Sequence, residues 1–193
     1  MLTKIHLLIF SFLLLANVAA SAAEKLTVYT VNYQLAYFAE LIGGNLVDVV
    51  FPLPSDIDPA FWEPNAKDIA EFQQADLILL NGAGYAKWLG RASLPRRKLV
   101  NTSAAFQHDY INVSETVTHQ HGPGGDHSHT GTAFTTWLDF NQAIMQAKAI
   151  LIALEKHDAE HAEDFRKSFA LLEAELAELD KTIKKIVEQD SNK

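Results

Sequence analysis

Residues 25–51 read KLTVYTVNYQLAYFAELIGGNLVDVVF, and this stretch decides the fold. Its first seven residues are rich in β-branched and aromatic side chains, which favours a strand. Residues 33–42 then carry apolar side chains at helical spacing, and Gly43-Gly44 is typical of a helix C-terminal cap. Residues 46–51 form a second apolar run. Two buried strands joined by a helix predict an α/β fold, with a parallel β-sheet lobe flanked by helices on both faces.

Two further strands are predicted in the same sheet. Residues 75–80 are the apolar run ADLILL, and residues 98–100 are a shorter run, KLV. Asn81-Gly-Ala-Gly84 follows the third strand, and we expect it to turn the chain into a short helix that carries Tyr85, Trp88 and Leu89. Its two glycines alone are a weak signal for phosphate binding, because the full dinucleotide fingerprint is missing. A tight strand-to-helix turn is the better interpretation.

Helices are predicted outside this run of strands. Asn65 is suited to cap a helix that runs to about Gln74. After the last strand, a long stretch without glycine or proline predicts a helix over about 141–156, and Asp158 is expected to cap the next one. The apolar residues of that last helix are spaced alternately four and three apart, which indicates a seam that packs against the same chain or pairs with another. The seam consists of Phe165, Phe169, Leu172, Leu176, Leu179, Ile183 and Ile186.

The first residues are typical of an export signal. Lys4 supplies a positive charge, residues 7–15 form an apolar core, and small residues precede a cleavage point near Ala22 or Ala23. We therefore expect residues 1–23 to be removed and the rest to be an exported soluble protein. A retained membrane anchor is the alternative, although the apolar core is too short to span a bilayer as a helix.

Composition limits the function. The sequence contains no cysteine, which excludes disulfides, thiolate metal ligands, cysteine nucleophiles and a lipid-bearing cysteine. The formal net charge is −8, and loss of Lys4 with the signal makes it one unit more negative. A chain this acidic is a poor candidate for binding nucleic acid. Roughly 170 residues after cleavage are enough for one domain with a core, or for one domain plus an appendage.

Four of the eight histidines lie within eleven residues, as the pairs His119/His121 and His127/His129. In an extended backbone, residues two apart project to the same side, so each pair can present two imidazoles to one point. The Gly-Pro-Gly-Gly run between the pairs can turn the chain so that they face each other. Four neutral imidazoles suit tetrahedral Zn²⁺, and copper or nickel less selectively. The alternative is a flexible, solvated loop with no fixed ligand.

Other candidate ligands are weaker. Asp126 and Glu63 are possible oxygen donors to the same metal ion. His157 and His161 are four residues apart, which suits a metal on a helix, but we expect Asp158 to interrupt the helix between them. We therefore do not predict a second histidine site there.

Several short motifs follow one another along the chain. They are Asp58-Pro59-x-x-Trp62-Glu63-Pro64, Asp68-Ile69, Ala75-Asp76-Leu-Ile, Asn81-Gly82-Ala-Gly84, Trp88-Leu89 and, after the histidine-rich loop, Trp137-Leu138-Asp139. In this order they resemble the substrate-binding proteins of zinc and manganese ABC transporters, over nearly all of the exported chain. The resemblance implies a periplasmic location and a first lobe built on a parallel sheet, with a long helix leaving that lobe as the backbone of a two-lobed protein.

The sequence departs from that family at the usual metal ligands. In most of the family a histidine follows Asp-Pro, where this sequence has Ala60, and a second histidine stands two residues before the later Trp, where this sequence has Thr135. The other two usual ligands belong to a second lobe. We expect residues 24–139 to form a metal-binding lobe with a histidine-rich loop at 118–130, and residues 140–193 to form a long helical linker with the second lobe absent.

The resemblance and the histidine loop together favour one function. We expect a periplasmic zinc-binding protein, not an enzyme, that delivers zinc to an ABC transporter permease in a truncated or divergent form, with manganese as the less favoured ion. The alternatives are a zinc buffer or handover protein that pairs with another chain through its C-terminal helix, or a non-functional fragment. A zinc hydrolase is the least favoured, because no general base stands at a matching offset.

Overall fold

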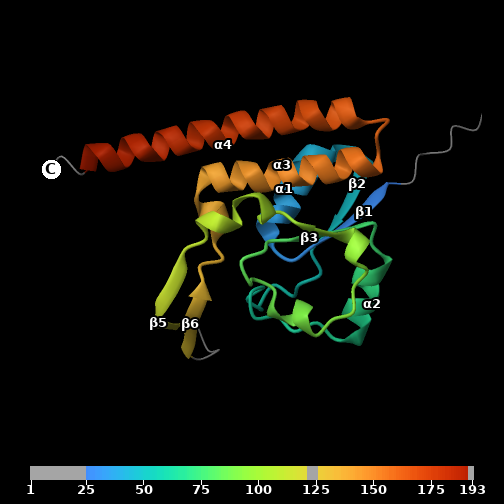
Figure 1. Ribbon diagram of the computed structural model, residues 1–193. Helices are drawn as coiled ribbons and strands as arrows, with labels where there is room; N and C mark the ends of the chain where they lie inside the picture. The colour runs from blue at the N-terminus through green and yellow to red at the C-terminus, as the bar shows by residue number, and fades with distance from the viewer. Residues whose placement is uncertain (1–24, 121–125, 191–193) are drawn as a thin grey trace, which may run out of the picture.

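The computed structural model describes residues 25–120 and 126–190, and for residues 114–120, 126–130 and 190 it describes the backbone alone. A parallel four-stranded sheet lies at the centre (Figure 1). The predicted α/β class and parallel pairing are confirmed, whereas the predicted signal peptide and its cleavage point lie outside the described residues. The strands run in the order β2-β1-β3-β4, and they are β1 (Leu26–Thr30), β2 (Val47–Val50), β3 (Leu77–Leu80) and β4 (Leu99–Asn101).

The first helix, α1 (Tyr33–Gly43), is fixed at both ends by its capping residues. The side chain of Asn32 accepts a hydrogen bond from the backbone N–H of Leu35 at 3.0 Å, which satisfies one of the free donors of the first turn. At the other end Gly44 has a φ of 54°, and its N–H donates to the carbonyl of Glu40. Because this backbone conformation favours glycine, the predicted glycine cap is confirmed.

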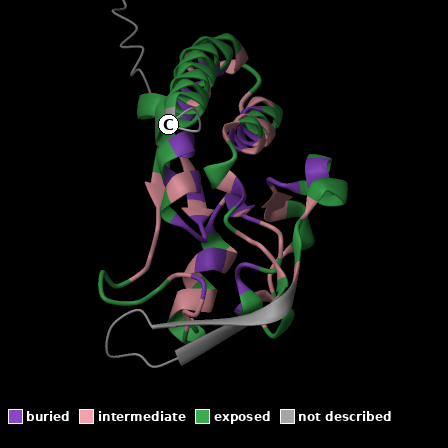
Figure 2. Ribbon diagram, turned by 90° about the vertical axis from the view of Figure 1, so that its left-hand side faces the viewer, coloured by how far each residue is buried: buried purple, intermediate pink, exposed green. Residues whose placement is uncertain are grey.

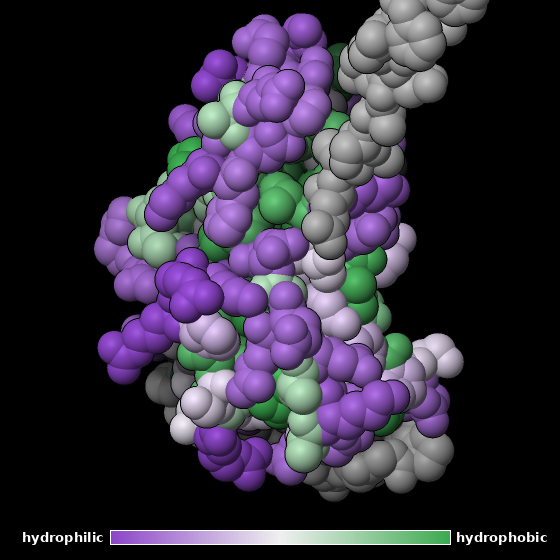
Figure 3. All heavy atoms as spheres, turned by 90° about the vertical axis from the view of Figure 1, so that its right-hand side faces the viewer, coloured by the Kyte–Doolittle hydropathy of each residue, from purple (hydrophilic) through white to green (hydrophobic). Residues whose placement is uncertain are grey.

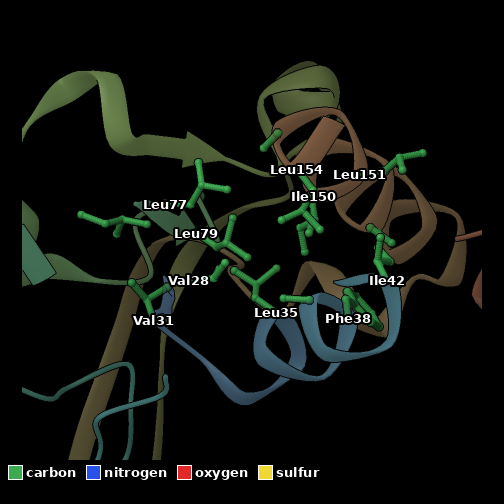
Figure 4. Close-up of a cluster of buried hydrophobic side chains, with 14 of the residues drawn as sticks. Val28, Val31, Leu35, Phe38, Ile42, Leu77, Leu79, Ile150, Leu151 and Leu154 are labelled. Carbon is green, nitrogen blue, oxygen red and sulfur yellow. The ribbon is translucent and has the colours of Figure 1, made fainter. Parts of the chain in front are cut away.

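Alternate strand residues point to opposite faces of the sheet, and helices cover both faces. Val28, Leu77 and Leu79 lie among side chains of α1 and of α3 (Phe140–His157) (Figure 4). Tyr29 on the opposite face packs on Phe72 of α2 (Ala66–Gln74), with ring centroids 5.0 Å apart. The predicted cap of α2 is also confirmed, as a capping box between Asn65 and Asp68.

The two C-terminal helices, α3 and α4 (Ala162–Asp190), lie side by side above the sheet (Figure 1). Ile150 and Leu154 of α3 are fully buried in the same core as the sheet. In α4 the apolar seam divides: Phe165, Phe169, Leu172 and Leu176 are buried, whereas Leu179, Ile183 and Ile186 are 49–57% exposed. Figure 2 shows how much of this helix is exposed.

The start of α4 differs from the prediction. Asp158 was expected to cap it, but it ends α3 instead, and α4 begins at Ala162. The Asp158 side chain accepts hydrogen bonds from the backbone N–H of His161 at 3.3 Å and from the ring of His161 at 2.7 Å. The aspartate is therefore used inside the connection between the helices, and this delays the start of α4.

Two elements near the middle of the chain complete the fold. A short 3₁₀ helix, η2 (Lys87–Gly90), follows β3, and it begins two residues later than predicted, so Tyr85 lies before it. An antiparallel pair, β5 (Asn112–Gln120) and β6 (Asp126–Thr132), projects beside the main sheet (Figure 1). The face in Figure 3 is mostly hydrophilic. Within 25–120 and 126–190, no helix combines the length and apolar character needed to cross a membrane.

Candidate metal site

Three of the four predicted histidine ligands lie on the two strands of the β5–β6 hairpin: His119 on β5, and His127 and His129 on β6. Its backbone register pairs His119 with His127 and Val117 with His129, and the ladder shifts register between Val113 and Val117. His121 lies outside the described residues, and so do the side chains of the other three histidines. At the base of the hairpin, the N–H of Ala133 donates to the carbonyl of Ile111 at 2.8 Å. The backbone thus aligns one residue of each predicted pair directly across the ladder.

Of the two weaker oxygen candidates, Glu63 is engaged elsewhere, and the side chain of Asp126 lies outside the described part of the chain. Oε1 of Glu63 lies 2.6 Å from Nη2 of Arg91 in an exposed ion pair. His157 is the last residue of α3, and His161 precedes α4, so the predicted interruption of the helix between these two histidines is confirmed. Among the residues whose side chains are described, no group of three or more His, Asp or Glu residues is arranged to hold a metal ion.

The two positions at which the resemblance implies histidine ligands, Ala60 and Thr135, lie in loops near the carboxyl edge of the sheet. Ala60 is 5% exposed, and its N–H donates to Oδ1 of Asp58 at 2.9 Å. Thr135 is exposed and precedes η6 (Thr136–Leu138), where its carbonyl accepts from the N–H of Leu138 at 3.0 Å. The methyl group of Ala60 has no lone pair to give a cation.

Tyr85 lies between these two loops. Its ring meets Phe134 at 5.2 Å and Trp137 at 5.8 Å, both edge to face. Burial raises the pKa of the Tyr85 phenol well above its ordinary value, and the carboxylate of Asp58 raises it further. A buried neutral aromatic ring therefore fills the space beside the Asp58 loop and the 134–137 segment.

A buried network of polar side chains supports this edge of the sheet. Asn81 Oδ1 accepts from Asn32 Nδ2 at 3.1 Å and from Gln146 Nε2 at 3.2 Å. Gln146 Nε2 also donates to Thr102 Oγ1 at 3.0 Å, and Gln146 Oε1 accepts from Thr136 Oγ1 at 3.3 Å. Sequence reasoning missed this network, although a polar residue within two positions of the end of a buried strand, as at Asn32 and Asn81, is a signal for it.

An open pocket of about 670 Å³ lies next to Thr135. Its walls come from residues 109–111, from Ala133, from residues 135–136 and 138–142, and from the exposed half of α4, including Ile183. Asp180 Oδ2 accepts a hydrogen bond from Lys184 Nζ at 2.6 Å, which raises the pKa of Lys184. The end of the α4 seam thus faces the segment that leads out of the histidine hairpin.

The chain matches known proteins over most of its length. Residues 28–193 match the family model described as "ZnuA: Zinc-uptake complex component A periplasmic". The high-affinity zinc uptake system protein ZnuA of Bacillus subtilis is 30% identical over 173 residues, which are 84% of this chain and 52% of that protein. The manganese ABC transporter substrate-binding lipoprotein PsaA of Streptococcus pneumoniae is 27% identical over 168 residues, which are 85% of this chain and 52% of that protein.

The fold is shared as well. The crystal structure of the metal-dependent lipoprotein YcdH from Bacillus subtilis superimposes with a TM-score of 0.66 at 27% identity, over 82% of this chain and 54% of that one. The chain spans about half the length of the relatives it matches. The shared sheet, its helices and the match from residue 28 to residue 193 place it in one family. The chain belongs to the family of the periplasmic zinc-uptake complex component A, ZnuA.

Proposed function

We propose that this chain is a periplasmic zinc-binding component of an ABC metal-uptake system, which hands zinc to the permease of that system. The observation that carries the proposal is the family match over residues 28–193. The relatives include a zinc uptake protein and a manganese-binding one, so zinc is the favoured ion and manganese the second. Their names describe a zinc uptake system protein and a substrate-binding lipoprotein of a manganese ABC transporter, which supports a role in metal binding and uptake outside the cytoplasm and not in catalysis.

The metal contacts belong to the hairpin in this proposal. The family position after Asp58-Pro59 holds alanine, and the other matching position holds Thr135, a poor substitute for imidazole on zinc. His119, His121, His127 and His129 remain as the proposed ligands, and the backbone pairing of His119 with His127 supports the meeting of these two at one ion. Four imidazoles complete a tetrahedral zinc shell without an open position.

A zinc titration of the exported chain tests this assignment. The comparison uses wild-type protein, a variant with all four hairpin histidines changed to alanine, and a control variant with His108→Ala and His157→Ala, which removes two histidines outside the hairpin. We expect one tight zinc ion per chain in the wild type and the control, and at least a hundredfold weaker binding in the hairpin variant. Equal affinity in all three proteins would sink the hairpin assignment.

A handover role is the second candidate, and the exposed half of the α4 seam favours it. Leu179, Ile183 and Ile186 continue the buried seam but remain about half exposed. Such a stripe suits docking to another protein chain. Light scattering over micromolar concentrations tests self-association: a mass that rises with concentration supports pairing through α4, and loss of that rise in Ile183→Glu places the contact on the seam. If the chain stays monomeric at every concentration, it does not pair with itself, and only a different protein chain remains as the partner of this surface.

A further inference from the structure

Both ends of the histidine hairpin contact one short segment, residues 81–85, which we call the 81–85 turn. It follows β3 and has an unusual backbone: Gly82, Ala83 and Gly84 all have positive φ, of 76°, 50° and 71°. Glycine adopts this conformation readily, but Ala83 carries a Cβ and is disfavoured there. A strained residue of this kind persists only where its surroundings fix it, so the contacts of the 81–85 turn deserve a functional explanation.

The chain entering the hairpin is fixed to this turn by Tyr110, two residues before β5. The N–H of Ala83 donates to the phenol oxygen of Tyr110 at 3.2 Å. The same phenol is hydrogen-bonded to Ser103 Oγ, which in turn donates to Asn101 Oδ1 at 3.1 Å. The ring of Tyr110 stacks edge to face on the fully buried Phe106.

The chain leaving the hairpin is fixed to the same turn by Asn81 and Tyr85. Asn81 Nδ2 donates to the carbonyl of Phe134 at 2.9 Å, two residues after β6. The ring of Tyr85 packs on the ring of Phe134. Asn81 is 1% exposed, and its amide oxygen is held by Asn32 and Gln146, so it cannot rotate without breaking those bonds.

A two-stranded hairpin is marginal by itself in water, because it has little apolar surface to bury. The β5–β6 pair forms a sheet separate from the four-stranded one. Its strands also contain few large apolar residues, and the ladder shifts register between Val113 and Val117. The hairpin therefore needs support at its base to keep its strands in one register.

We propose that the 81–85 turn is the anchor that pre-organises the histidine hairpin, with Asn81 and Tyr110 as its positioning residues. Neither residue is among the proposed metal ligands. They hold the two roots of the hairpin at a fixed separation, so that the strands pair and His119 stays opposite His127. The effect on metal affinity rests on the proposed function, whereas the effect on hairpin geometry does not.

The test compares Tyr110→Phe with the wild type and with Tyr33→Phe as a matched control. Phenylalanine keeps the ring of Tyr110 against Phe106 but removes the oxygen that accepts from Ala83. Tyr33 is 64% exposed on α1 and loses the same atom away from the anchor. Because the chain has no cysteine, Glu115→Cys on β5 and Lys148→Cys on α3 give a unique pair of sites for spin labels in each protein.

Two measurements then separate the anchor from the metal site. In metal-free protein we expect a narrow label-to-label distance distribution in the wild type and in Tyr33→Phe, and a clearly broader one in Tyr110→Phe. With Zn²⁺ alone as the probe, we expect the affinity of Tyr110→Phe to fall about three- to tenfold, in keeping with the loss of one hydrogen bond from the bound geometry.

The two possible failures are distinguishable. An unchanged distance distribution in Tyr110→Phe overturns the anchor, even if the melting temperature falls, because a merely structural residue lowers stability without moving the hairpin. If the wild type does not bind zinc through its hairpin histidines, the proposed metal site fails, and the distance distribution of the metal-free protein still decides the anchor.

Discussion

At Gly82 the neighbouring atoms leave no room for any side chain larger than hydrogen. A Cβ built on it would lie 1.9 Å from Ser103 Oγ and 2.5 Å from Asn101 Oδ1, and its φ is 76°. We expect Gly82→Ala to lower the free energy of unfolding by about 2 kcal/mol or more, because the new methyl group must displace buried polar atoms in a backbone that disfavours it.

Urea unfolding measures this effect, with Gly90→Ala as the control. A Cβ at Gly90 meets nothing within 4 Å, so that variant should stay within about 1 kcal/mol of the wild type. Similar midpoints for the two alanine variants would contradict the close packing around Gly82. From the sequence, the two glycines of this turn predicted a tight turn, but the side chains that crowd Gly82 come from the end of β4 and the residues after it, so they are invisible in the local pattern.

Tyr85 makes stability depend on alkaline pH. Burial, and then the charge of Asp58, raise the pKa of its phenol above the ordinary value of about 10. As pH rises above about 10, the unfolded chain releases the proton of this tyrosine while the folded chain retains it. The stabilising contribution is therefore complete below pH 10 and is lost as pH rises further.

We expect Tyr85→Phe to lose less stability than the wild type between pH 9 and pH 11, by about 1 kcal/mol, because phenylalanine has no proton to release. Urea unfolding curves at both pH values measure this difference. Between pH 7 and pH 9 the two proteins should show the same pH dependence. An equal loss in both proteins above pH 10 would show that Tyr85 ionises as freely in the folded chain as in the unfolded one.

At the scale of elements, local signals predicted well wherever the stabilising partners are close in sequence. The cap of α1 at Gly44 and the capping box of α2 at Asn65 are local features, and both were visible in the sequence. The predicted start of α4 was wrong, because Asp158 is hydrogen-bonded to His161 in the connection between α3 and α4 and does not cap α4. The strands β5 and β6 were not predicted as strands, because their sequence is polar and lacks the apolar alternation of a half-buried sheet.

The two halves of helix α4 are predicted to contribute unequally to the stability of the protein. Leu172 is 3% exposed and Leu179 is 49% exposed, although both belong to the same seam. We expect Leu172→Ala to lower the free energy of unfolding by about 2–5 kcal/mol, because it leaves a cavity between helices. Leu179→Ala should cost about 1 kcal/mol or less.

Thermal or urea unfolding of the two variants makes a matched comparison, since the chemical change is the same. An equally large loss for Leu179→Ala would show that the second half of α4 is covered in solution. In that case the loss should grow with protein concentration if a second copy provides the cover.

At the scale of the molecule, the fold was more predictable than the site. Apolar runs and their spacing are enough to predict a parallel sheet with helices on both faces. The buried network is different, because Asn81 and Gln146 are 65 residues apart and meet only once α3 lies across the sheet edge. The histidine ligands remain a prediction, supported at the level of the backbone by the pairing of His119 with His127.

Zinc binding should also stabilise the whole chain in a pH-dependent way. A ligand that binds only the folded state, at a hundred times its dissociation constant, adds about 2.7 kcal/mol. For a chain of this size we expect zinc to raise the melting temperature at pH 7.5 by about 5–10 °C.

Imidazoles ligate only when neutral and ordinarily titrate near pH 6.5, so the zinc-induced shift of the melting temperature should shrink as pH falls through that value and vanish at about pH 5. Calorimetry with and without zinc at pH 7.5, 6.5 and 5 measures it, and the variant without the four hairpin histidines should show no shift at any pH. A zinc shift that persists at pH 5, or in that variant, would mean that carboxylates hold the ion and that the hairpin does not.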